Sequence, residues 1–114
     1  CCDTPIQIWG DGESVRDFIF IDDIVEATTR LIKLPLDSGT YNLSSGTGYS
    51  INQVLGIVEK VCRKPLYTEY RGARGIDVRN VILDNTQLKE LLAWAPLVDL
   101  EDGVRRTFTW LRQA

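Results

Sequence analysis

Several residue types are absent or scarce in this sequence. The 114 residues contain no histidine and no methionine, and only three cysteines, Cys1, Cys2 and Cys62. Without histidine, the chain has no Ser-His-Asp or Cys-His catalytic arrangement and no histidine-containing metal site. No two cysteines have the C-x-x-C spacing of a metal or redox site, so Cys62 is expected to be a buried, inert thiol. The sequence therefore predicts no metal centre and no catalytic residue of these classes.

Long apolar runs and an excess of positive charge are missing as well. No apolar run approaches the ~18 residues of a membrane-spanning helix, and no signal peptide is visible. Sparse cysteine is typical of a reducing compartment, so we expect a cytoplasmic protein that does not enter a membrane. The net charge of −3 argues against a nucleic-acid-binding surface. It leaves room for a small anion, because two or three arginines suffice to bind one.

The composition is that of an ordinary folded domain, with 44% hydrophobic and 25% charged residues. Apolar periodicity and turn residues predict a fold of class α+β, a small mixed α/β domain over residues 1–114 with few short strands and about four helices. The helices are expected to start at Asp22 or Asp23, after Ser50, near Asn85 and near Asp99. The expected extended segments are 6–9, 16–21, 41–44, 66–70 and 78–83.

Four sequence blocks occur in an order that matches a known family. They are PIQIWGDGESVRDFIFIDDIVEA (5–27), TYNLSSGTGYSINQVLGIVEKV (40–61), RGIDVRNVILDNTQLKELLAWAP (74–96) and LEDGVRRTFTWLRQ (100–113). Together they resemble the C-terminal, substrate-binding part of extended short-chain dehydrogenase/reductases that act on nucleotide sugars, most closely UDP-glucose 4-epimerases. In one block, Gly75 lies one place earlier than the family pattern has its glycine.

The resemblance implies a larger, NAD-dependent enzyme, of which this sequence would be one part. The family binds NAD with a G-x-x-G-x-x-G loop in its Rossmann half and transfers a proton with a Tyr-x-x-x-Lys pair. Neither motif occurs in the 114 residues. We therefore expect no catalytic or cofactor-binding residue here and no activity of the chain alone. Because the opening residues lead straight into an apolar strand, we also expect the sequence to start inside the longer family pattern.

Two arginines are the main candidates for substrate binding. The resemblance implies that Arg16 and Arg74 contact the diphosphate of a nucleotide sugar, a role that suits the forked donors of a guanidinium. The alternative for Arg16 is a surface ion pair with Asp17 or Glu13. The alternative for Arg74 is a solvated loop position, since nearby arginines carry the same charge. Both arginines are expected to converge on one pyrophosphate pocket.

Three further residues complete the expected substrate site. Ile8 and Trp9 resemble the segment that lines the nucleotide base, against which an indole offers a flat stacking face. The alternative is that Trp9 is a core residue or covers a sheet edge. Asn42 resembles a residue at a strand end near the nicotinamide region, and its alternative role is turn capping. Trp94 and Trp110 are expected to anchor the C-terminal helices in the core.

The expected function is thus binding of a nucleotide sugar, most simply a UDP-sugar, within an NAD-dependent epimerase or dehydratase. The open edges of few, short strands favour a further partner, either a second copy of the chain or a Rossmann half. The alternatives are a stand-alone, non-catalytic binding or oligomerisation module, or an inactive remnant.

Overall fold

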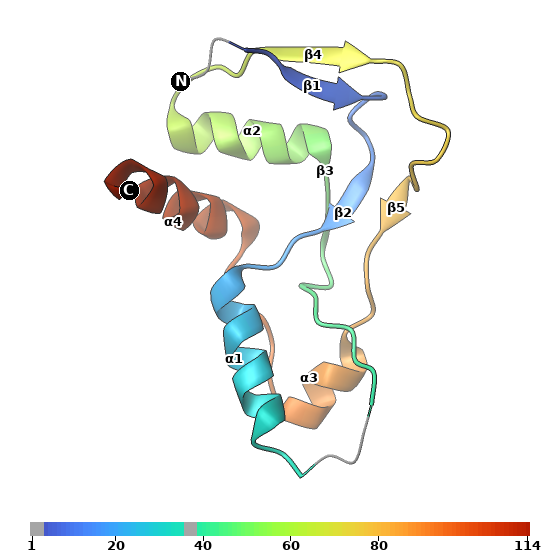
Figure 1. The fold of residues 1–114 in the computed structure, drawn as a ribbon, viewed down its shortest axis with the longest axis vertical. Helices are drawn as coiled ribbons and strands as arrows, with labels where there is room; N and C mark the ends of the chain where they lie inside the picture. Colours follow the sequence, from blue (N-terminus) through green and yellow to red (C-terminus); the bar gives the residue numbers. More distant parts are fainter. Residues whose placement is uncertain (1–3, 36–38) are drawn as a thin grey trace.

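The computed structural model describes residues 4–35 and 39–114, so Cys1 and Cys2 lie outside the described residues. The chain is elongated and flat, with extents of 50 × 39 × 18 Å (Figure 1). Its elements are β1 (Ile6–Trp9), β2 (Val15–Asp17), α1 (Ile21–Ile32), β3 (Gly48–Ser50), α2 (Ile51–Cys62), β4 (Thr68–Arg71), β5 (Asn80–Val81), α3 (Thr86–Leu92) and α4 (Leu100–Gln113). This order of strands and helices confirms the predicted mixed α/β domain.

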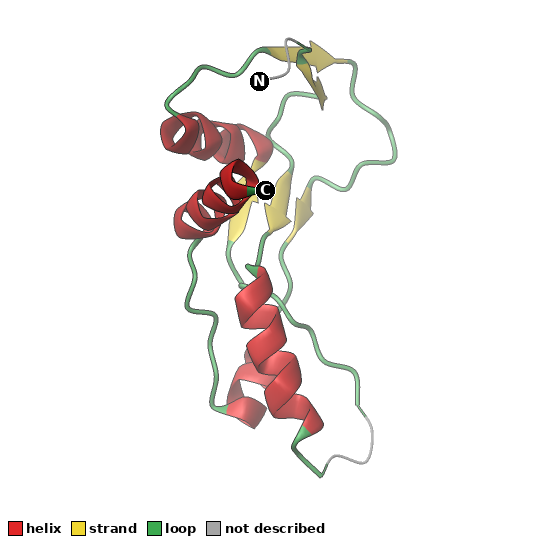
Figure 2. Cartoon of the chain, turned by 60° about the vertical axis from the view of Figure 1, so that its left-hand side comes forward, coloured by secondary structure: helices red, strands yellow, loops and turns green. Residues whose placement is uncertain are grey.

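The strands form two small sheets. Strands β1 and β4 pair in parallel, with Trp9 opposite Arg71. Strand β2 lies between β3, to which it is antiparallel, and β5, to which it is parallel. Helices α2 and α4 pack side by side next to the sheets, while α1 and α3 pack against each other at the opposite end (Figures 1 and 2).

Three helices start where the sequence predicts them. At α2, the Ser50 side chain accepts from the Gln53 backbone N–H while the Gln53 side chain accepts from the Ser50 N–H, which is a complete capping box. The Asp99 carboxylate caps α4. Asn85 precedes α3, but its side chain makes no capping bond and instead donates to the Ser44 carbonyl. Among the described helices, none is long and apolar enough to cross a membrane.

The predicted start of α1 is wrong. The helix begins at Ile21, its N-cap residue is Phe20, and no side chain caps it. Asp23 is buried and turns away from the helix end, because its carboxylate accepts the backbone N–H groups of Leu97 and Val98 at 3.0 and 3.1 Å. This carboxylate therefore joins α1 to the segment that leads into α4.

The predicted strand at 41–44 is also not formed. The Asn42 side chain donates to the Asp84 carbonyl and the Ser44 hydroxyl donates to the Leu83 carbonyl, at 3.0 and 3.3 Å, so side chains join these segments where a backbone ladder was expected. The Asn42 bond reaches a carbonyl 42 residues later in the chain, so it is not the local contact of the turn-capping alternative. The strand of this region lies a few residues later, at Gly48–Ser50.

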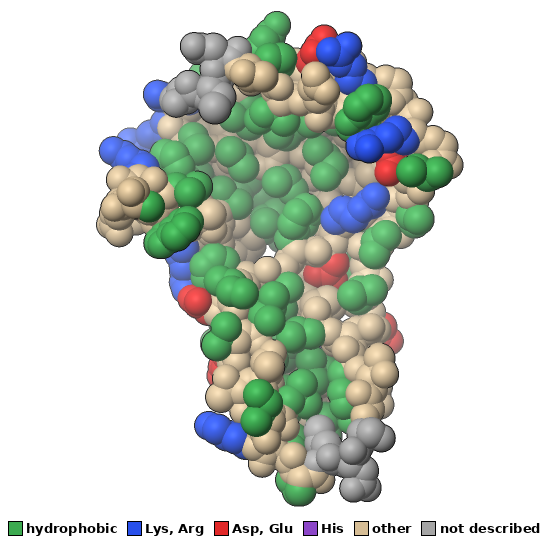
Figure 3. All heavy atoms as spheres, in the orientation of Figure 1, with side chains coloured by type: hydrophobic (Ala, Val, Ile, Leu, Met, Phe, Trp, Pro, Cys, Tyr) green, Lys and Arg blue, Asp and Glu red, His purple; other side chains and the backbone are tan. Residues whose placement is uncertain are grey.

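The hydrophobic core is small and lies mainly between α1 and α3, where Ala27, Leu88 and Trp94 are buried. Trp94 is a core residue as predicted, but the prediction for Trp110 is wrong, because α4 turns its indole outward and leaves it 65% exposed. The accessible surface of 8179 Å² exceeds the ~6,300 Å² expected for a folded chain of 12.9 kDa. Figure 3 shows that hydrophobic side chains occupy much of one face.

Candidate functional site

A cleft of about 400 Å³ opens where β1 and β4 end. Because the two strands are parallel, the loops that follow them leave the sheet at the same edge. The loop after β1 turns sharply at Gly10 and Gly12, whose φ angles of +84° and +75° few side chains tolerate. The loop after β4 supplies the facing wall with the segment that contains Ala73 and Arg74. Two loops far apart in the sequence thus enclose one polar cleft.

Trp9 and Arg74 meet inside this cleft. The Arg74 guanidinium lies over the Trp9 indole, 4.5 Å from the ring centroid, an arrangement that the negative ring face stabilises. Arg74 also lies 3.7 Å from the Asp77 carboxylate, while Trp9 remains 45% exposed. The structure therefore brings together two residues that the sequence singled out, with a guanidinium and an aromatic face directed into the same space.

Two further arginines line the cleft, and the sequence did not distinguish their roles. Arg79 binds the Asp11 carboxylate through both terminal nitrogens, at 3.1 and 3.2 Å, and Arg71 pairs with Glu69 at 2.8 Å. Three arginines and two aspartates line the cleft, and with Glu69 beside it each arginine has one carboxylate partner. The available signal was three arginines within nine residues, but their convergence depends on the β1–β4 pairing.

Asp11, which lines the cleft, is held in its charged form. The Glu13 backbone N–H, together with the Arg79 guanidinium, keeps the pKa of Asp11 below its ordinary value, and the slight burial of the carboxyl offsets only part of this effect. Asp11 is therefore ionised at neutral pH and forms an ion pair with Arg79. An anion that enters the cleft meets Arg71 and Arg74 paired only with exposed carboxylates, which are easily exchanged.

The remaining predicted residues lie outside this cleft. Arg16 sits in β2 opposite Tyr49 and Val81, is half-buried, and donates to the Val15 carbonyl at 2.7 Å. It does not line the cleft, although Ser14, two residues earlier, does, so the cleft does not bring Arg16 and Arg74 together as expected. Ile8 is buried in β1 next to Trp9, with only 6% of its surface exposed.

No group of three or more cysteine, aspartate or glutamate residues in the described ranges is arranged to hold a metal ion. The N-termini of α2 and α4 are occupied by the side chains of Ser50 and Asp99, which cap these two helices and leave less room for an external phosphate. The polar cleft beside β1 and β4 is thus the best candidate for an anion site among these residues.

Comparison with known proteins places the chain in a family. Residues 3–107 match the family described as GDP-mannose 4,6 dehydratase. The UDP-glucuronate 4-epimerase of Thermodesulfobacterium geofontis is 38% identical over 112 residues, which cover 97% of this chain and 34% of that protein.

Solved structures agree with this match. UDP-glucose 4-epimerase of Thermotoga maritima, determined with UDP-glucose, is 35% identical, with a TM-score of 0.88 over 96% of this chain and 35% of that one. UDP-glucuronic acid 4-epimerase of Bacillus cereus, in complex with UDP-glucuronic acid and NAD, is 25% identical. Its TM-score is 0.87, over 97% of this chain and 36% of that one. The chain spans about a third of these relatives. These 114 residues therefore belong to the extended short-chain dehydrogenase/reductases of the nucleotide-sugar epimerase and dehydratase family, of which they form a short C-terminal portion.

Proposed function

We propose that this chain is the nucleotide-sugar-binding part of an NAD-dependent epimerase or dehydratase and is not catalytic alone. The observation that carries the proposal is the cleft itself, in which the partly exposed Trp9 indole and three guanidinium groups converge. The ligand that needs both a flat apolar face and several cationic donors is a nucleoside diphosphate joined to a sugar. Because a 38% identical relative is named for UDP-glucuronate, the nucleotide is expected to be UDP.

In this proposal Arg74 binds the diphosphate and Trp9 stacks on the base. Arg74 has only an exposed aspartate and the indole as partners, so it can exchange them for phosphate oxygens. A charge-assisted hydrogen bond of this kind contributes ~1.5–3 kcal/mol. Ile8 supports the Trp9 backbone from its buried position in β1. Arg16 and Asn42 remain predicted contacts to the diphosphate and the sugar region.

The residues of this chain do not fit NAD. Besides the missing glycine loop, α2 and α4 have their N-termini occupied by their own capping side chains, so neither offers free N–H groups to a pyrophosphate. The role left for these residues is to bind and orient the sugar nucleotide for chemistry carried out by groups outside the 114 residues.

The large exposed surface supports the association that the proposal requires. An excess of about 1,900 Å² over the value expected for a folded monomer is enough for one side of a permanent interface. We propose that a Rossmann half covers this surface, in a cytoplasmic enzyme. A stand-alone binding or oligomerisation module is the second candidate, because the same surface would serve self-association.

Calorimetric titration with UDP and UDP-glucose tests nucleotide binding. We expect saturable binding to the wild-type chain, a loss of ~10- to 100-fold in affinity for Arg74→Ala, and a clear loss for Trp9→Ala. Arg105→Ala removes an exposed arginine that pairs with Glu101 and Asp102 on α4, far from the cleft lining, and serves as the matched control. Equal affinities of Arg74→Ala and Arg105→Ala would contradict the proposed site.

A further inference from the structure

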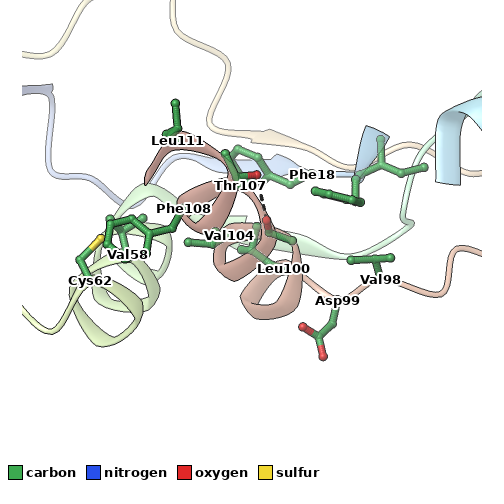
Figure 4. A pocket seen from close by; sticks show the side chains of 13 residues that line it. Phe18, Val58, Cys62, Val98, Asp99, Leu100, Val104, Thr107, Phe108 and Leu111 are labelled. Atoms are coloured by element: carbon green, nitrogen blue, oxygen red, sulfur yellow. Dashed lines mark hydrogen bonds between the residues drawn. The ribbon is translucent and has the colours of Figure 1, made fainter. Parts of the chain in front are cut away.

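Helix α2 is held in place by contacts at both of its ends. Toward its C-terminus, Val58 and the half-buried Cys62 line an apolar cavity of about 390 Å³ together with Phe108 of α4 (Figure 4). At its N-terminus, the capping box of Ser50 and Gln53 sets the start of the helix. The helix is therefore a firm support for the segment that its first turn contacts.

The first turn of α2 contacts the loop that follows β1. The backbone N–H groups of Ile51 and Asn52 donate to the carbonyls of Ser14 and Gly12, at 3.2 and 3.0 Å. These two N–H groups have no partner inside the helix, because an α-helix leaves its first four donors unpaired. The same loop carries Asp11 and forms one wall of the polar cleft. The start of α2 thus holds that wall from outside the cleft.

The Asn52 carboxamide adds three side-chain contacts. Its Nδ2 donates to the Asp11 carbonyl at 3.0 Å and to the Glu13 carboxylate at 2.6 Å, and its Oδ1 accepts from the Tyr70 hydroxyl at 2.8 Å. Tyr70 lies in β4 directly before Arg71, which lines the opposite wall of the cleft. Asn52 therefore joins the two walls, and only a side chain with both donors and an acceptor makes this set of contacts.

Gly12 shows how closely Asn52 lies against the loop. A Cβ atom at Gly12 would overlap the Asn52 carboxamide, and the φ angle of +75° disfavours other residues as well. The loop therefore adopts this position only with a glycine beneath the Asn52 side chain. Asp11, the preceding residue, binds Arg79 through both terminal nitrogens, so the placement of the loop determines where that guanidinium lies.

We propose that Asn52 is a positioning residue for the nucleotide cleft. It holds the turn at residues 10–12 and β4 in the arrangement that directs Trp9 and Arg79 toward one ligand. Asn52 itself does not line the cleft, so it acts through these residues and does not contact the nucleotide. Its effect on UDP affinity rests on the proposed function, whereas its effect on the geometry of the empty cleft does not.

One variant and a matched control test this role by UDP affinity. Asn52→Asp keeps an acceptor for Tyr70, but it loses both donations and places a second carboxylate against Glu13. Gln87→Glu is the control, because Gln87 is exposed, is the second residue of α3 as Asn52 is of α2, and undergoes the same change from amide to carboxylate. In calorimetric titration of the 114-residue chain with UDP, we expect Asn52→Asp to lose ~10-fold in affinity and Gln87→Glu to bind as the wild type does.

A second substitution separates positioning from a general loss of packing. Adding Glu13→Gln to Asn52→Asp supplies an amide donor to the new carboxylate and removes the like charge. This exchange of donor and acceptor should recover ~3-fold in UDP affinity, because the Asp11 carbonyl still lacks its donor. A loss of packing alone would not be recovered by a change in hydrogen-bond partners.

A measurement without ligand separates the inference from the proposed function. In the free ¹⁵N-labelled chain, Asn52→Asp should shift the Trp9 indole N–H and the Arg79 side-chain N–H signals and leave the Trp94 indole in place, whereas Gln87→Glu should shift none of them. Tyr70→Phe removes only the hydroxyl that binds Asn52 and should shift the same two signals less, so it replaces Asn52→Asp if that variant does not fold.

The inference is overturned if the Trp9 and Arg79 signals do not respond to Asn52→Asp or Tyr70→Phe. It is also overturned if Asn52→Asp binds UDP as tightly as Gln87→Glu does, or if Glu13→Gln recovers no affinity. If the wild-type chain does not bind UDP, the proposed function fails, and the Trp9 and Arg79 signals of the free chain still decide the role of Asn52.

Discussion

Asp17 is the polar group whose replacement should affect the sheet most. Its carboxylate accepts the Ser45 N–H at 2.8 Å, the Ser45 hydroxyl at 2.6 Å and the Gly46 N–H at 3.0 Å, with a longer contact to the Leu83 N–H at 3.4 Å. One side chain thus joins β2 to Ser45 and Gly46, which precede β3, and to Leu83, which follows β5. Replacing Asp17 with alanine removes every one of these contacts at once.

The expected cost follows from these distances and from the exposure of the site. Hydrogen bonds to a charged group contribute ~1.5–3 kcal/mol each when buried, but Asp17 is half-buried and water can replace part of the loss. We expect Asp17→Ala to lower the free energy of unfolding by about 2–4 kcal/mol, and Asp17→Asn by about half as much, because the amide keeps one acceptor oxygen. Asp22→Ala, which removes an exposed carboxylate 3.6 Å from Arg106, should cost less than ~1 kcal/mol.

The pH dependence of the folding stability is a second test of the Asp17 contacts. Partial burial raises the pKa of Asp17, but the hydrogen bonds from Ser45, Gly46 and Leu83 outweigh it and hold the pKa below the ordinary value of 3.8. Because the pKa of Asp17 is lower in the folded state than in the unfolded state, the ionised carboxylate stabilises the fold fully at pH values above the unfolded-state pKa. This stabilisation is lost as the pH falls through the folded-state pKa. The stability difference between wild type and Asp17→Asn should therefore be constant near neutrality and shrink in acid, below about pH 4.

Urea denaturation followed by far-ultraviolet circular dichroism, repeated from pH 7 to pH 2.5, measures both effects. Equal costs for Asp17→Ala and Asp22→Ala at pH 7 would refute the argument. So would a difference between wild type and Asp17→Asn that stays the same in acid.

Three other substitutions test the contacts that hold the helices. Asp23→Ala leaves two backbone N–H groups before α4 without their buried acceptor and should cost ~3 kcal/mol in urea denaturation, whereas a cost below 1 kcal/mol would show that water replaces the carboxylate. Ser50→Ala opens the capping box of α2 and should cost ~1 kcal/mol, and Gln53→Ala should cost less, because the serine keeps its own bond to the helix; the reverse order would contradict this account.

Elements whose signals are local could be predicted from the sequence. Ser50 and Gln53 lie three residues apart, and their reciprocal bonds depend on no distant part of the chain, so the start of α2 was predicted correctly. The same holds for Asp99 at α4. Asp23 shows where such reasoning fails: an aspartate at a helix start satisfies the rule for a cap, but its partners are backbone groups more than 70 residues later. Only the folded chain shows that these distant backbone groups, and not the helix end, bind the Asp23 carboxylate.

The candidate site was predictable in part for the same reason. Trp9 and Arg74 were named from their motifs, but their stacking depends on the parallel pairing of β1 with β4, which joins Ile6 to Thr68. Without that register, Arg71 and Arg79 could not be placed in the same cleft. Trp110 illustrates the opposite error, because a tryptophan on an amphipathic helix indicates burial, yet these 114 residues do not cover it.

Titration of the ¹⁵N-labelled chain with UDP-glucose, followed by the indole N–H signals of its three tryptophans and the side-chain N–H of Arg74, tests nucleotide-sugar binding most directly. Binding in the cleft predicts that the Trp9 and Arg74 signals shift together and saturate with one dissociation constant. Trp94, buried between α1 and α3, and Trp110, exposed on α4, should stay where they are. Unchanged Trp9 and Arg74 signals at millimolar UDP-glucose, or shifts confined to Trp94 or Trp110, would contradict the account.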